Sequence, residues 1–137
     1  PVMLTYDFSI EEGVDEVGDK IYLSPLLYFT SEDNPFKSEE RSYPIDFSYA
    51  RKYRMMMNIE IPEGYKVEAV PESKKIVLEE KLGELTYQLS VNGSKIQLVY
   101  NFQINFPLVP TDYYQDLKLL FKNMAEKNAE KIVLSKI

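Results

Sequence analysis

Two runs of alternating apolar and polar residues lie on either side of Asn92-Gly93, within the stretch from Leu85 to Phe106, and they predict a β-hairpin. Asn-Gly is a strong hairpin signal because a two-residue type I′ turn needs positive φ at both positions. With Asn92 and Gly93 as the loop, Leu89 faces Ile96. The apolar residues of both strands then share one face, so this register predicts a half-buried hairpin.

The same period of two predicts further strands along the chain. They are Val2 to Ile10, Ile21 to Leu23, Tyr43 to Phe47, Arg51 to Ile61, Tyr65 to Ala69 and Ile76 to Glu80. Polar and charged residues predict surface loops from Glu11 to Asp19 and from Thr30 to Ser42. Ser24-Pro25 predicts a single helical turn, with serine as its cap and proline in its first position, from which Leu26 to Phe29 cover the core.

After Phe106 the apolar spacing changes to three and four residues, which predicts a helix over about 112–128. Asp112 and Gln115 match a capping box at its start. The apolar end of the chain predicts a closing edge strand over about 131–136, with an extension of the helix as the alternative. The residues expected on the buried face of the helix are Tyr113, Leu117, Leu120, Phe121 and Met124.

Short strands at regular spacing with one late helix predict a mainly β fold. We expect an antiparallel two-sheet β-sandwich of the immunoglobulin-like kind, with one C-terminal α-helix. The chain has 137 residues, which predicts a single domain over 1–137. Because Pro1 leads directly into strand-like sequence, we expect the chain to be a piece of a longer protein.

The absence of cysteine and histidine narrows the possible chemistry. Thiol nucleophiles and imidazole bases are excluded, and zinc, haem and iron–sulfur sites lose their usual ligands. A net charge of −6 argues against nucleic acid as a partner, since phosphate binding needs basic patches. No run is apolar enough to insert into a membrane. We expect no cofactor, no metal and no catalytic residue.

Two acidic stretches are the remaining candidates for carboxylate chemistry. The first holds Glu11, Glu12, Asp15, Glu16 and Asp19, but lacks the ligand spacing of a calcium loop. The second runs from Ser31 to Arg41, and nothing fixes the distance between its carboxylates as glycoside hydrolysis requires. Solvated loops are the favoured interpretation of both.

The chain is rich in aromatic residues, with 11 Tyr and 7 Phe. Most tyrosines, including Tyr6 and Tyr53, lie in the apolar phase of predicted strands and are expected in the core. Others are harder to place, and exposed aromatic side chains can form a binding surface. The candidate interaction surface consists of Tyr28, Phe36, Tyr43 and Tyr49. In the run Met55-Met56-Met57, only Met56 is expected to be exposed.

Several motifs occur in order: Val17 to Tyr22, Asn34 to Arg41, Tyr43 to Phe47 and Ile59 to Tyr65. With the closing helix, they resemble the C-terminal domain of bacterial transglutaminase-like proteins. In those proteins an N-terminal β-rich domain and a transglutaminase-like domain precede this one. The expected catalytic Cys, His and Asp belong to the neighbouring domain, so no catalytic residue carries over.

The resemblance implies a non-catalytic accessory domain of an exported, periplasmic or cell-surface protein. We expect it to pack against the neighbouring transglutaminase-like domain of the same chain, or to present substrate to it. The alternative is a glycan- or peptide-binding module that uses exposed tyrosines. Structural roles explain the motif residues: Pro35 and Phe36 pin a loop to the core, and Asp46 accepts backbone hydrogen bonds at a strand end.

Overall fold

The structure is a computed structural model that describes residues 1–29 and 31–137. Its strands are β1 (Val14–Val17), β2 (Lys20–Leu23), β3 (Ile45–Asp46), β4 (Arg51–Glu60), β5 (Tyr65–Ala69), β6 (Lys74–Val77), β7 (Gly83–Asn92), β8 (Lys95–Ile104), β9 (Leu108–Val109) and β10 (Ile132–Lys136). The helix α1 (Tyr114–Ala129) follows a short 3₁₀ turn, η2 (Thr111–Tyr113), and a second, η1 (Glu79–Lys81), precedes β7. All strand pairs are antiparallel, so the expected mainly β class with one C-terminal helix is confirmed.

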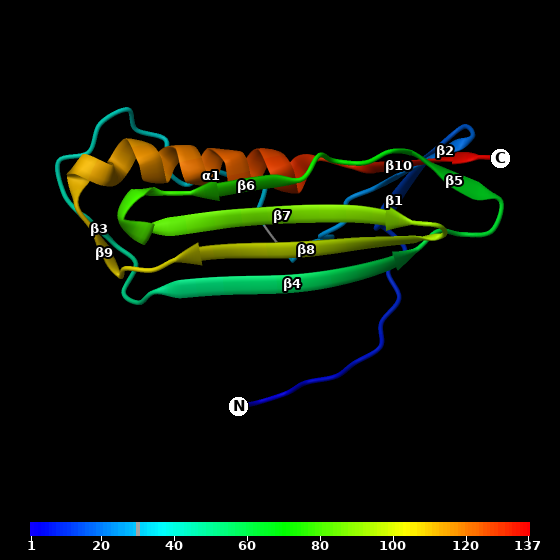
Figure 1. Cartoon of the computed structure of the whole chain (residues 1–137), viewed down its shortest axis with the longest axis horizontal. Helices are drawn as coiled ribbons and strands as arrows, with labels where there is room; N and C mark the ends of the chain where they lie inside the picture. The colour runs from blue at the N-terminus through cyan, green and yellow to red at the C-terminus, as the bar shows by residue number, and fades with distance from the viewer. Residues whose placement is uncertain (30) are drawn as a thin grey trace.

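The largest sheet has the strand order β4-β8-β7-β6 and is built around the predicted hairpin (Figure 1). Leu89 pairs with Leu98 and Val91 pairs with Ile96, so the two-residue loop is Gly93-Ser94. The expected partner of Leu89 is therefore wrong by two residues. A shift of two leaves every side chain on its expected face, and the apolar face is the buried one.

The loop lies one residue later than expected because two turn signals, Asn92-Gly93 and Gly93-Ser94, overlap in the sequence. Gly93 has φ of +61° and stands in the first loop position. A type II′ turn requires glycine at that position and accepts serine after it. The register that results places Leu85 opposite Phe102 and Tyr87 opposite Tyr100, all four of them buried.

Replacing Gly93 by alanine should therefore destabilise the protein by about 1 kcal/mol. A Cβ at this position meets no atom within 4 Å, so the cost comes from the positive φ alone. Ser94→Ala is the matched control, and it should change the unfolding free energy by less than about 0.5 kcal/mol. Urea unfolding of both variants measures the difference. Equal effects of the two substitutions would contradict this turn assignment.

Helix α1 packs against the large sheet and forms the main core with it. In Figure 1 it runs beside β6, along the direction of the strands. Leu117 and Leu120 are fully buried against strand residues such as Leu85 and Leu98. The expected capping box is wrong, because no described side chain caps the start of the helix. Gln115 instead donates a hydrogen bond to the backbone oxygen of Glu39, at 2.5 Å.

Side-chain hydrogen bonds to the backbone hold the segment after Ser31 against α1. Thr30, the first residue of the expected loop, lies outside the described residues. Asn34 donates from Nδ2 to the Lys118 oxygen at 3.0 Å and accepts from the Phe36 N–H at 3.0 Å. The Tyr114 hydroxyl donates to the Ser38 oxygen at 2.7 Å. The burial of Phe36 in the core confirms that it pins the loop, whereas Pro35 is exposed and its expected part is wrong.

Asp46 has the structural role that its position at a strand end predicts. It is the last residue of β3, and its Oδ1 accepts a hydrogen bond from the Ser48 N–H at 2.7 Å. Ser48 has a positive φ of 66°, so this bond supports the turn that leads from β3 toward β4.

A second sheet, with the order β1-β2-β10-β5, packs at one end of the large sheet (Figure 1). The closing strand β10 pairs on both sides, so its expected place at a sheet edge is wrong. Its Ile21, Ile132 and Leu134 form a smaller buried cluster with Ile96 of β8. Leu89 packs against both this cluster and the main core. Strand β1 lies where an acidic loop was expected, and its four residues are all exposed.

The expected strand from Val2 to Ile10 is wrong. These residues form no strand, and Leu4 is 77% exposed. In Figure 1 this N-terminal trace runs away from the sheets. Alternation predicts which side chains share a face, but a strand also needs a neighbour to bond, and no described segment pairs with this one.

Candidate interaction surface

Four exposed aromatic side chains from two segments contact one another in sequence. Tyr6 and Phe8 have ring centroids 6.4 Å apart, Phe8 and Tyr28 are also 6.4 Å apart, and Tyr28 and Phe29 are 4.7 Å apart. Their exposed fractions run from 45% for Phe29 to 68% for Tyr6. We call these four residues the aromatic strip. Scattered exposed aromatics are ordinary, whereas a contiguous group is a candidate for a binding surface.

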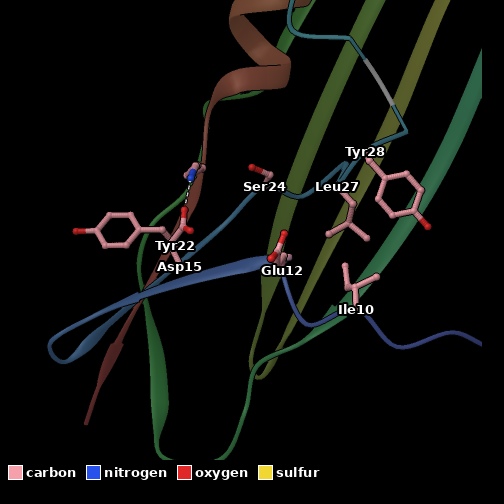
Figure 2. Close-up of a pocket in the computed structure, with 9 residues that line it drawn as sticks. Ile10, Glu12, Asp15, Tyr22, Ser24, Leu27 and Tyr28 are labelled. Atoms are coloured by element: carbon pink, nitrogen blue, oxygen red, sulfur yellow. Dashed lines mark hydrogen bonds and ion pairs between the residues drawn. The ribbon is translucent and has the colours of Figure 1, made fainter.

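A hollow of about 260 Å³ adjoins the strip (Figure 2). Ile10, Leu27 and Tyr28 supply its apolar side, and the carboxylates of Glu12 and Asp15 supply its polar side. The dashed line in Figure 2 is the ion pair between Asp15 and Lys131, at 2.5 Å. The hollow therefore offers an apolar wall beside a charged one that contains both carboxylates and the ammonium group of Lys131.

Two acidic residues of this region form ion pairs with lysines. Asp15 pairs with Lys131, and Asp19 lies 3.9 Å from Lys136, so both face lysines of β10 or its approach. Within residues 1–29 and 31–137, no group of three or more Asp, Glu, Cys or His side chains is placed to hold a metal ion. The same part of the chain contains no helix long and apolar enough to cross a membrane.

The four residues of the expected interaction surface have different fates. Tyr28 is exposed and belongs to the aromatic strip, whereas Phe36 is buried among aromatic rings, so its placement on the surface is wrong. Tyr43 is 78% exposed and stands apart from the strip. Tyr49 is exposed, with the guanidinium of Arg51 5.2 Å from its ring centre.

Sequence reasoning missed three members of the strip. Tyr6 and Phe8 lie in the apolar phase of the expected N-terminal strand, and Phe29 lies in the run expected to cover the core. In that run the structure buries Leu26 and leaves Tyr28 and Phe29 exposed. A positive φ of 52° at Leu27 turns the chain there, and the apolar pattern gives no signal for it.

Comparison with known families identifies most of the chain. Residues 19–134 match the family model described as a domain of unknown function with solved structure, DUF3858. The chain belongs to this family. The match runs from β2 into β10, so it includes the large sheet, α1 and both central strands of the small sheet. The N-terminal half of the aromatic strip lies before the matched residues of the DUF3858 domain.

The DUF3858 domain has the fold of part of a larger solved structure. A putative protease from Parabacteroides distasonis matches it with a TM-score of 0.60 and 16% sequence identity. The match covers 72% of this chain and 19% of that chain. At this identity the likeness concerns the fold alone. A search of curated proteins found no match.

Proposed function

We propose that this DUF3858 domain is a non-catalytic accessory domain of an exported transglutaminase-like protein. Its aromatic strip packs against the neighbouring catalytic domain or presents substrate to it. The contiguous exposure of Tyr6, Phe8, Tyr28 and Phe29 carries the proposal, because such a surface is stabilised when a partner covers it. In this proposal the catalytic Cys, His and Asp belong to the partner, since this chain has neither Cys nor His.

Two further observations support the proposal. The match covers only 19% of the solved structure with this fold, and the description of that protein as a putative protease fits a catalytic protein that carries such a domain. The resemblance of the Asn34 to Arg41 motif supports a transglutaminase-like parent and a periplasmic or cell-surface location. The immunoglobulin-like arrangement of two sheets is part of the same proposal, and the buried cluster that joins Ile132 and Leu134 of the small sheet to Ile96 of the large sheet supports it.

The test uses the full-length protein that carries this domain. Replacing Phe8 and Tyr28 together by serine should weaken the contact between the domains on the order of tenfold or more, because truncated interface aromatics cost about 1–2 kcal/mol each. The measurements are the activity of the neighbouring domain and its protection from proteolysis. Tyr43→Ser is the matched control, since Tyr43 is also highly exposed but lies outside the strip. Unchanged activity and protection in the double variant would refute the proposal.

Glycan or peptide binding is the second candidate function. Tyr28 and Phe29, with ring centres 4.7 Å apart, form a small platform next to the apolar wall of the hollow. Sugar rings and extended peptides both pack on such platforms. This function requires the isolated chain to bind its ligand without the neighbouring domain. A glycan array and a peptide library that give no signal above the Tyr28→Ser variant would exclude it.

A further inference from the structure

Strand β4 leaves one long edge of the large sheet open. It pairs with β8 on one side, and no other described strand lies beside it (Figure 1). Its register with β8 continues without a shift from Arg51 to Glu60, and the strand contains neither proline nor glycine. A straight edge of this length presents a row of unpaired backbone N–H and C=O groups to any second strand.

The outer face of β4 is complementary to itself when a second copy runs antiparallel to it. With the two-fold axis at Met56, Lys52 faces Glu60 of the second copy and Arg54 faces Asn58 of the second copy. Each pair occurs twice, and no like charges face each other. Opposite charges in directly opposed positions stabilise a pair of strands. Glu60 can make this contact, because its side chain is more than two-thirds exposed and its ion pair with Lys95 of its own chain is long, at 3.6 Å.

The inner face of β4 is also complementary to that of a second copy, and the rest of the chain leaves part of it exposed. The same register places Tyr53 opposite Ile59 of the second copy, and Met55 opposite Met57 of the second copy. Tyr53 is 53% exposed, although it points to the same face as the core, so its expected burial is wrong. A groove of about 310 Å³ lies next to it, lined mainly by aromatic and Met side chains. A second copy at this edge removes that apolar surface from water.

We propose that two copies of this chain associate through their β4 edges, antiparallel about a two-fold axis at Met56. The two four-stranded sheets then form one continuous sheet across the axis. Assembly stops at two copies, because each chain has one free β4 edge and the dimer uses both of them. Phe29 lines the groove and is also a member of the aromatic strip, so the tests leave it unchanged. They alter β4 residues, with β6 residues as controls, and do not depend on the proposed function.

Charge reversal tests the register directly. In Lys52→Glu two carboxylates face each other across the interface, and in Glu60→Lys two ammonium groups do so, so each variant should raise the dimer dissociation constant on the order of tenfold or more. In a heterodimer of the two variants, both facing pairs join a carboxylate to an ammonium group, so an equimolar mixture should form the dimer again. Sedimentation velocity over a concentration series distinguishes the 16.0 kDa monomer from the dimer. Lys75→Glu on β6 is the matched control and should leave dimerisation unchanged.

A cross-linking variant gives an independent readout. The chain has no cysteine, so Met56→Cys introduces a single thiol, and a disulfide can form only between copies. Directly opposed residues of antiparallel strands have Cα atoms about 4.5–5.5 Å apart, which fits disulfide geometry. Oxidation should give a covalent dimer on a non-reducing gel. Val77→Cys on β6, with a similar exposed fraction, should run as a single chain on the same gel, because its thiols lie far from the axis.

Three results would overturn the proposal. The first is a wild-type chain that stays at 16.0 kDa through the whole concentration series. The second is a dimer whose dissociation constant is changed by neither Lys52→Glu nor Glu60→Lys. A dimer that forms by exchange of the N-terminal segment would give this result. The third is a mixture of the two variants that fails to restore the dimer. Far-UV circular dichroism of each exposed-site variant confirms that it is folded.

Discussion

Replacing Phe36 by alanine is expected to lower the free energy of unfolding by about 3–5 kcal/mol. The Phe36 ring is buried and packs edge-on against the rings of Phe47, Tyr114 and Phe121. Truncation removes these contacts and leaves a cavity between α1 and the loop that crosses it. Such a loss is a large part of the roughly 5–15 kcal/mol that stabilises a typical domain.

Urea unfolding, followed by tyrosine fluorescence, measures the effect. Tyr43→Ala is the matched control, because Tyr43 lies only a few residues away and is 78% exposed. That control should stay within about 0.5 kcal/mol of the wild type. A loss below about 1 kcal/mol in Phe36→Ala would mean that the ring does not fill the core. Phe36 would then again be a candidate for the interaction surface.

Alkaline pH is expected to unfold the protein, and Tyr100→Phe should remove part of that sensitivity. Burial raises the pKa of Tyr100 from 10.0 to about 12, against a smaller opposing effect of its hydrogen bond with Asn128. Burial also raises the pKa of Tyr87, with Glu130 adding to the shift. The folded state thus keeps both phenols neutral after the unfolded chain has ionised.

The stability that the neutral phenol of Tyr100 provides is complete below pH 10 and is lost as the pH rises toward 12, and the loss from Tyr87 extends to higher pH. For Tyr100 the pH-dependent part amounts to about 2–3 kcal/mol. Urea unfolding at several pH values between these limits, for the wild type and for Tyr100→Phe, measures it. Tyr43→Phe is the control and should keep the wild-type slope. Parallel curves for the wild type and Tyr100→Phe would contradict the prediction.

The long elements could be predicted because their patterns are local. Strands β4, β7 and β8 each repeat the period of two over ten residues, and α1 repeats the helical spacing over sixteen. Helix α1 begins and ends within two residues of its expected range, and so does β10. In these segments the side chains that must be buried determine both the type of element and the face that it presents.

The pairing partners of the short strands and the exposure of aromatic side chains could not be predicted, because both depend on residues far away in the chain. Nothing local shows that Val2 to Ile10 lacks a partner among the described strands, or that Val14–Val17 finds one in β2. The same holds for the candidate surface. Phe36 is buried because Asn34 bonds to the backbone of Lys118, whereas Tyr28 is exposed because no described element covers it.

Strand β10 lies between β2 and β5 and is bonded to both. Its residue Ile132 pairs with Leu23, more than a hundred positions earlier. During translation, the sheet that contains β2 and β5 therefore cannot form until β10 has left the ribosome. A nascent chain that stalls after α1 would display the open sides of both strands, and chaperones would have to protect them until synthesis finished.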